Sequence, residues 1–90
     1  MKIHAVCGAG IGTSVILKSN LDRVIAKLGL EADVEAVSIS EATLPESKAQ
    51  VIFTTPEVVD KLSGLRAEVI EVENIFDLAE LEFKVQASLG

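Results

Sequence analysis

Short apolar runs alternate with helical stretches along this 90-residue chain, and that alternation restricts the possible folds more than any other feature. Strands that alternate with helices favour a parallel sheet with right-handed crossovers. The sequence therefore predicts an α/β fold, with helices on both faces of a four-stranded parallel sheet. The expected strands cover residues 2–6, 33–38, 49–54 and 67–72.

Two helices are predicted from apolar stripes and from residues that are common at helix ends. The first should begin near Thr13 or Ser14, carry one apolar stripe, and end at Gly29, a common residue after a helix. The second, a short helix, should have Thr55 as its cap and Pro56 at its first position.

Two further helical segments are predicted from capping residues. A helical turn is expected within 40–48, with Ser40 as its cap. The last helix should cover 77–89, where Asp77 and Glu80 have the spacing of a capping box.

The expected strand order is 2-1-3-4, which places the switch point of the sheet between the first and third strands. Ligands of such sheets bind outside the carboxyl ends of the strands at that point. Cys7 directly follows the first strand, while Thr54 and Thr55 end the third. The site is therefore expected at Cys7.

The loop after the first strand combines a thiol with glycines. Gly8, Gly10 and Gly12 can adopt positive φ, which would let successive backbone N–H groups form an anion-binding nest. The following helix N-terminus attracts anions and lowers the pKa of a nearby thiol. A nucleophile in an anion cradle suits covalent phosphoryl transfer, so Cys7 is the predicted catalytic residue. The predicted phosphoryl-binding loop is Gly8, Ala9, Gly10, Ile11, Gly12, Thr13 and Ser14.

Competing interpretations of this loop are weaker. A Walker A loop would need a lysine that is missing, and the dinucleotide fingerprint fails at Thr13. A cysteine-phosphatase loop would need arginine at the same position, where it would clamp the phosphoryl group. A phosphatase or thiol reductase stays open as an alternative, although the missing arginine and the single cysteine count against both. Cys7 as a buried structural thiol in a tight turn is the simplest alternative.

Composition excludes several other classes of function. Eight basic and 14 acidic residues give a net charge of −6, which argues against nucleic acid and anionic membranes as partners. One cysteine excludes an internal disulfide and a multi-cysteine metal site, and we expect no metal and no cofactor. The first residues do not resemble a signal peptide and no apolar run is long enough to insert in a membrane, so we expect a cytoplasmic location.

The eight residues from Cys7 to Ser14, placed after a short strand, resemble the phosphocysteine loop of IIB proteins of the bacterial sugar phosphotransferase system (PTS). The following segment, VILKSNLDRVIAKLGLEADVE, is most similar to the ascorbate-type branch, with galactitol-type proteins next. Lactose/cellobiose-type IIB proteins share the fold and the cysteine but usually carry a Met-Ser-Thr-Ser-like segment at 11–14. The resemblance implies one IIB-like domain over residues 1–90.

The same resemblance implies a phosphocarrier. Cys7 would accept phosphoryl from a phosphohistidine on a IIA protein and pass it to a sugar, or sugar-like substrate such as ascorbate, held by a membrane IIC protein. No metal or nucleotide is implied. A regulatory module that senses its own phosphorylation remains a further alternative.

Other polar residues have structural explanations that we favour. His4 is expected to pack within its strand rather than act as a second catalytic group. Lys18 and Arg23 are expected to be solvated helix charges. Direct substrate contact by Thr54 or Thr55 is the less favoured interpretation of the end of the third strand.

Overall fold

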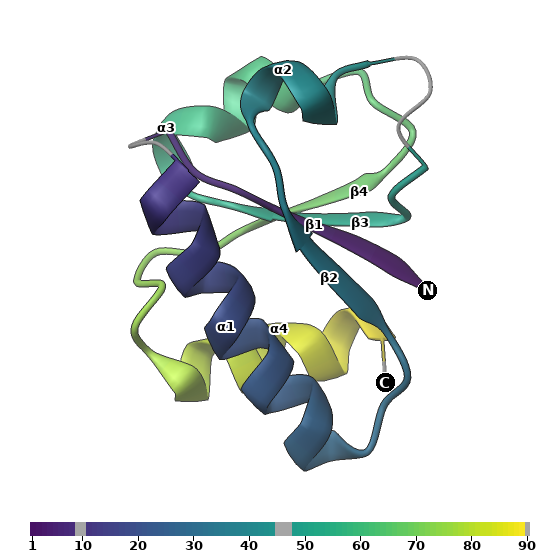
Figure 1. Cartoon of the computed structure of the whole chain (residues 1–90), viewed down its shortest axis with the longest axis vertical. Coiled ribbons are helices and arrows are strands. Elements are labelled where there is room, and N and C mark those ends of the chain that lie inside the picture. Colours follow the sequence, from purple (N-terminus) through teal and green to yellow (C-terminus); the bar gives the residue numbers. More distant parts are fainter. Residues whose placement is uncertain (9–10, 45–47, 90) are drawn as a thin grey trace.

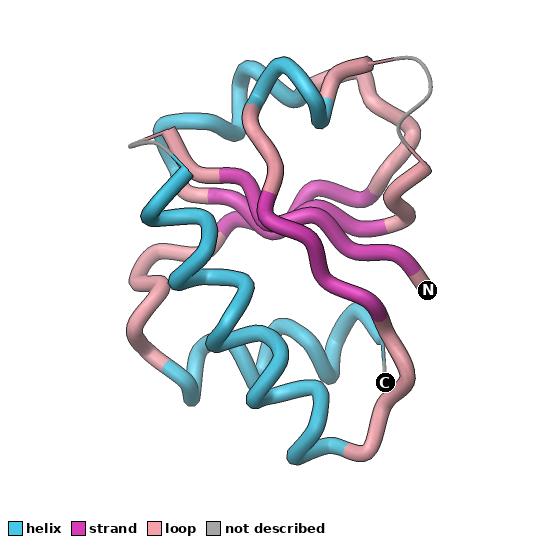
Figure 2. The backbone as a smooth tube through the Cα atoms, in the orientation of Figure 1, coloured by secondary structure: helices cyan, strands magenta, loops and turns pink. Residues whose placement is uncertain are grey.

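A four-stranded parallel sheet organises the protein, and the computed structural model describes residues 1–8, 11–44 and 48–89. The strand order is β2-β1-β3-β4, which confirms the predicted order and fold class. Figure 2 shows the strands as the central layer between helices. The strands are β1 Lys2–Val6, β2 Asp33–Ala36, β3 Val51–Thr54 and β4 Glu68–Glu71.

The last three strands are shorter than the sequence predicted. The described residues that flank each of them make at most one further backbone hydrogen bond to each neighbouring strand. Val37 still donates its N–H to the carbonyl of Ala5 at 3.1 Å, and Val72 does so to Thr54 at 2.7 Å. Beyond Val37, Ser38 already caps the next helix. The apolar run therefore continues past the residues that pair.

Helices cover both faces of the sheet. Figure 1 shows α1 and α4 on one side, and α2 with α3 on the other. Among the described residues, no helix combines the length and apolar character that a membrane span needs. The helices are α1 Ile11–Leu28, α2 Ile39–Ala42, α3 Pro56–Val59 with the 3-10 turn η1 Asp60–Leu62, and α4 Leu78–Leu89.

Two predicted helix starts were wrong. Helix α1 begins at Ile11 rather than near Thr13 or Ser14. Helix α2 is capped by Ser38 and not by Ser40: the Ser38 hydroxyl accepts the N–H of Glu41 at 3.1 Å, and the Glu41 carboxylate accepts the N–H of Ser38 at 3.2 Å. The acid three residues after Ser38 completes this reciprocal capping box, which Ser40 could not form.

The start of α4 is capped, but only half of the predicted capping box forms. The Asp77 carboxylate accepts the N–H of Glu80 at 3.2 Å. The Glu80 carboxylate instead accepts the N–H groups of Glu73 at 2.8 Å and Asn74 at 3.0 Å. It therefore ties the loop after β4 to the helix.

Alternate side chains of the two central strands supply two cores. In β1, Ile3 and Ala5 face α1 and α4, whereas Val6 faces α2 and α3. In β3, Phe53 belongs to the first core and Ile52 to the second. Burial of both faces explains why these strands are apolar at nearly every position. The larger core also contains Leu17, Leu21, Val24, Val34, Leu81 and Val85.

His4 is packed within β1, as predicted, and is 5% exposed. Its Nδ1 atom is buried without a hydrogen-bond partner, and its Nε2 atom lies 3.9 Å from a Glu35 carboxylate oxygen. Burial lowers the pKa of His4 below its ordinary value of 6.5, and the nearby Glu35 opposes that shift only in part. At neutral pH and above, the folded protein therefore holds a neutral imidazole.

Acid is expected to destabilise the fold through His4. The unfolded chain binds a proton at His4 more readily than the folded chain does. The free energy of unfolding therefore has its full value above pH 6.5, where His4 is neutral in both states. It then decreases as the pH falls toward the lower pKa of the folded state. Urea unfolding at about pH 5 and about pH 7.5 should show a larger acid loss for the wild type than for His4→Leu. Equal losses would contradict the prediction.

Candidate active site

Cys7 lies at the carboxyl end of β1, at the switch point of the sheet. Val6 pairs with Thr54 in β3, so the residues that follow each strand are neighbours. The Cys7 side chain is 6% exposed and packs in the core shared by β1 and α1. The predicted nucleophile therefore stands where parallel α/β sheets place ligands.

Thr54 fixes the end of β1 immediately before Cys7. Its hydroxyl donates a hydrogen bond of 2.7 Å to the Val6 carbonyl, and its side chain is fully buried. The hydroxyl is thus committed to the backbone. It holds the end of β1.

The N-terminus of α1 follows Cys7 closely. Gly12, Thr13 and Ser14 lie in the first turn of this 18-residue helix, where backbone N–H groups lack helical partners. Gly12 is exposed, Thr13 half-buried and Ser14 buried, and the turn contains no acidic residue. The predicted loop residues Ala9 and Gly10 lie outside the described residues, and Ile11 is the first residue of α1.

The two described loop glycines, Gly8 and Gly12, do not adopt the conformation that was predicted. Neither Gly8 nor Gly12 has a positive φ, unlike Gly29, which ends α1 as expected. Gly8 instead permits a close approach, because an added Cβ would lie 3.0 Å from Val58 Cγ2 and 3.1 Å from Glu57 Cγ. An added Cβ at Gly12 would meet nothing within 4 Å. Close packing against α3 therefore explains Gly8.

Gly8→Ala is expected to destabilise the protein, whereas Gly12→Ala is not. Overpacking against Val58 and Glu57 should lower the free energy of unfolding by about 1–3 kcal/mol. Alanine at Gly12 meets open space inside a helix and should be neutral or stabilising by up to about 1 kcal/mol. Urea denaturation of the two variants measures the contrast, and equal effects would contradict this explanation of Gly8.

The segment that follows β3 brings the carboxylate of Glu57 close to Gly8. Thr55 occupies the cap position of α3, but its side chain makes no capping bond, contrary to the prediction. Its hydroxyl donates 2.7 Å to Glu57 Oε1 instead. That hydrogen bond, followed by one from the backbone N–H of Glu57, lowers the pKa of Glu57. Glu57 is therefore ionised at neutral pH, with Oε1 3.5 Å from the position of a Gly8 Cβ.

The resting Cys7 is a thiol rather than the activated thiolate that the loop suggested. Burial, and secondly the negative charge of Glu57, raise the pKa of Cys7 from 9.0 to about 11. The expected lowering by a helix N-terminus is thus outweighed by these two effects. At neutral pH the unloaded Cys7 is therefore mainly protonated.

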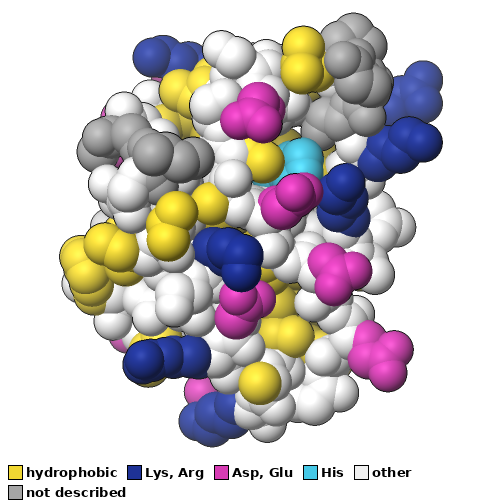
Figure 3. All heavy atoms as spheres, viewed as in Figure 1, with side chains coloured by type: hydrophobic (Ala, Val, Ile, Leu, Met, Phe, Trp, Pro, Cys, Tyr) yellow, Lys and Arg dark blue, Asp and Glu magenta, His cyan; other side chains and the backbone are white. Residues whose placement is uncertain are grey.

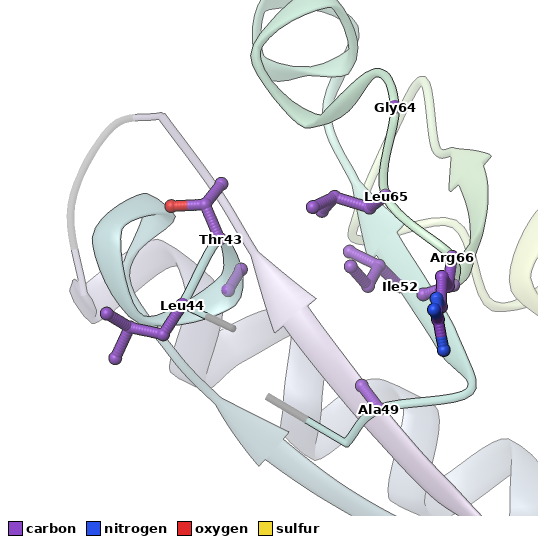
Figure 4. Close-up of a pocket in the computed structure, with 9 residues that line it drawn as sticks. Thr43, Leu44, Ala49, Ile52, Gly64, Leu65 and Arg66 are labelled. Carbon is purple, nitrogen blue, oxygen red and sulfur yellow. The ribbon is translucent and has the colours of Figure 1, made fainter. Parts of the chain in front are cut away.

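Neither arginine of the chain lies at Cys7. Arg23 follows Ile11 by 12 residues along α1, which is about 18 Å of helix. Arg66 precedes β4 and so lies at the amino ends of the parallel strands, opposite the carboxyl ends where Cys7 lies. It lines a cavity of about 240 Å³ together with Ile52 and Leu65 (Figure 4), and none of the residues that line this cavity belongs to the predicted loop. The structure therefore offers no arginine clamp of the cysteine-phosphatase kind.

The second cavity, of about 180 Å³, is also remote from Cys7. It is lined by His4, Lys2, Glu35, Glu41 and other residues of the β1, β2 and α2 region. Figure 3 shows the histidine bordered by acidic and basic side chains on this face. Within residues 1–8, 11–44 and 48–89, no group of three or more His, Cys, Asp or Glu side chains could hold a metal ion.

Comparisons with known proteins agree on one family. A family model described as "PTS system, Lactose/Cellobiose specific IIB subunit" matches residues 2–87. An ascorbate-specific PTS system EIIB component from Mycoplasma pneumoniae is 29% identical over 91% of this chain and 87% of its own length. A protein of the same description from Salmonella typhimurium is 27% identical over 70% of this chain and 62% of its own length.

A solved structure shares the fold. The lactose-specific IIB component domain of the phosphoenolpyruvate:carbohydrate phosphotransferase system from Streptococcus pneumoniae superimposes with a TM-score of 0.71. The match covers all of this chain and 98% of the other, at 13% sequence identity. At that identity the likeness concerns the arrangement of strands and helices.

Proposed function

Because this chain belongs to the lactose/cellobiose-specific IIB subunit family of the PTS, we propose that it is a cytoplasmic phosphocarrier whose phosphoryl group is held by Cys7. Proteins of this family are phosphotransferases. The donor is a phosphohistidine of a IIA protein, and the acceptor is a sugar or sugar-like substrate held by a membrane IIC protein. The carrier unit comprises residues 1–90.

Two transfers make up the proposed reaction. In the first, the Cys7 sulfur bonds to phosphorus, the donor's nitrogen–phosphorus bond breaks, and the thiol proton passes to the imidazole that is released. In the second, a substrate hydroxyl oxygen bonds to phosphorus, the sulfur–phosphorus bond breaks, and the hydroxyl proton returns to sulfur. The protein contributes positioning and electrostatic stabilisation, as in other phosphoryl transfers.

The observation that carries the proposal is the position of Cys7 between the end of β1 and the N-terminus of α1. Backbone N–H groups at such a terminus bind phosphate oxygens. The absence of an acidic residue in the first turn of α1 leaves that terminus open to an anion. The proposed phosphoryl-binding residues are Gly8, Ala9, Gly10, Ile11, Gly12, Thr13 and Ser14.

A carrier also needs a phosphocysteine that survives until its acceptor arrives. Thr13 stands where a cysteine phosphatase has its arginine, and both Arg23 and Arg66 lie away from Cys7. Without a guanidinium to stabilise the transition state, attack by water is slow. This favours transfer to a protein-bound substrate over hydrolysis.

The proposed substrate is ascorbate. Both relatives named above are described as ascorbate-specific. One aligns with 91% of this chain and the other with 70%. The family model names lactose and cellobiose, so these sugars are the competing substrates. Phosphorylation of ascorbate, lactose and cellobiose by membranes that contain the cognate IIC protein would decide between them.

The test of the carrier function is phosphorylation by a protein donor. The purified chain is incubated with phosphoenolpyruvate, the general PTS proteins and a panel of IIA proteins, and its intact mass is recorded. We expect one phosphoryl group per chain, stable until IIC membranes and substrate are added. Turnover of small aryl phosphates without a stable adduct would contradict the proposal and indicate a cysteine phosphatase.

A further inference from the structure

Glu57 lies against the loop that carries the nucleophile, although it belongs to α3 and follows Cys7 by fifty positions. The Glu57 Cγ atom is 3.1 Å, and its Oε1 atom 3.5 Å, from the position that a Cβ of Gly8 would occupy. The absence of a side chain at Gly8 is what admits Glu57. The pairing of Val6 with Thr54 brings the two segments together.

The Glu57 carboxylate is held in this position as an anion. The Thr55 hydroxyl donates to Oε1 at 2.7 Å, and Thr55 itself is only 9% exposed. A half-turn of backbone separates the two residues, so the hydrogen bond restricts where the carboxylate can point. Glu57 is exposed, but this hydrogen bond holds its carboxylate near Cys7.

Among the described residues, no lysine or arginine forms an ion pair with Glu57, and Lys61, which follows it by four positions on η1, is exposed. The first turn of α1 offers Thr13 and the buried Ser14, and β3 offers Thr54. The first lysine of α1, Lys18, is paired with Asp22 at 2.7 Å. Asp60, the next carboxylate after Glu57, follows α3 on η1 and is exposed, as Glu57 is.

We propose that Glu57 is a positioning residue that sets the charge balance at Cys7, disfavouring both a bare thiolate and a phosphoryl group on sulfur. The inference rests on the proposed function and deepens it. A phosphoryl group on Cys7 carries about two negative charges at neutral pH, and the fixed Glu57 anion repels them. Repulsion raises the tendency of the phosphocysteine to give its phosphoryl group to an acceptor. It also keeps the unloaded sulfur protonated and unreactive toward adventitious electrophiles.

Glu57→Gln tests this role because it removes the charge and keeps the shape. Asp60→Asn is the matched control, since it removes one charge from the same segment without touching Gly8. Two quantities are measured: the rate of iodoacetamide alkylation of Cys7 against pH, and the ratio of phosphorylated to free chain at equilibrium with a fixed mixture of phosphorylated and free IIA protein.

Glu57→Gln should speed alkylation at a fixed pH below the thiol pKa by roughly 3- to 10-fold, with the pH profile moved to lower pH. The equilibrium ratio of phosphorylated to free chain should rise by a similar factor of roughly 3 to 10. Asp60→Asn should change either quantity by less than about 1.5-fold, because exposed charges at a distance are screened. Thr55→Val, which releases the carboxylate, should give alkylation rates between those of the wild type and Glu57→Gln.

Several results would overturn the inference. Alkylation profiles of Glu57→Gln that match the wild type, or equal changes in Asp60→Asn, would show that the local charge has no special effect. Faster alkylation without a higher phosphorylated fraction would also contradict it. The alkylation assay needs no phosphoryl donor, so it can succeed even if the carrier function fails. If the wild type is phosphorylated but Glu57→Gln is alkylated at the wild-type rate, the role of Glu57 is wrong while the carrier function stands.

Discussion

Replacing Cys7 by alanine is expected to abolish phosphoryl acceptance from a IIA donor, with a loss of at least roughly 10³-fold in transfer rate. The reason is that the proposed reaction forms a covalent bond to sulfur. Cys7→Ser should be nearly as inactive, because a hydroxyl of much higher pKa replaces an already reluctant thiol. The transfer rate from radiolabelled phospho-IIA measures the effect.

The control for this prediction is the fold of the variants. Cys7 is 6% exposed within the larger core, so alanine should preserve the structure and lower the free energy of unfolding by only about 1 kcal/mol. Far-UV circular dichroism and urea unfolding should therefore resemble those of the wild type. A well-folded Cys7→Ala protein that still accepts phosphoryl at the wild-type rate would contradict the assignment of Cys7.

Phe53→Ala is expected to produce the largest loss of stability. Phe53 lies in β3, is fully buried, and joins the core between the sheet and the α1–α4 layer. Truncation of a buried phenylalanine costs about 3–5 kcal/mol. A domain of this size has a total stability of about 5–13 kcal/mol, so the variant should be close to unfolding.

Phe83→Ala is the matched control, because Phe83 is 72% exposed on α4. Its loss should change the free energy of unfolding by no more than about 0.5 kcal/mol. Urea denaturation of both variants measures the difference. A cost below about 1.5 kcal/mol for Phe53→Ala would contradict the two-core description of the sheet.

The strand order and the position of Cys7 could be predicted because each depends on a pattern that extends along the chain. Alternating strands and helices imply parallel pairing, and the order 2-1-3-4 then brings the ends of β1 and β3 together. Element ends were predicted less well. The choice of Ser38 over Ser40 as a cap depends on whether Glu41 turns back to the backbone, which composition alone does not determine.

Glu57 was the functional candidate that sequence reasoning missed. No sequence motif gave it a role of its own. The predicted strand order already placed the segment after Thr54 beside Cys7, and the glycine at position 8 was a further signal of close approach. The direction of the Glu57 side chain, however, depends on its hydrogen bond with Thr55, which no periodicity reveals.

The same contact explains why the pKa of Cys7 could not be predicted from the loop alone. A glycine loop before a helix suggests a low thiol pKa. That expectation takes into account only the positive end of α1. The structure adds burial of the sulfur and the negative Glu57, both of which raise the pKa of Cys7. The motif therefore points to Cys7 as the candidate nucleophile, whereas its resting protonation state depends on neighbours that the motif does not include.

The most direct test of the account is to locate the phosphoryl group on the chain. The protein is phosphorylated through a IIA donor, its ³¹P spectrum is recorded, and the modified peptide is mapped by mass spectrometry. We expect a thiophosphate signal and a modified peptide that contains Cys7, with neither in Cys7→Ala. A phosphoryl group on His4, or on a hydroxyl such as that of Thr13 or Ser14, would contradict it.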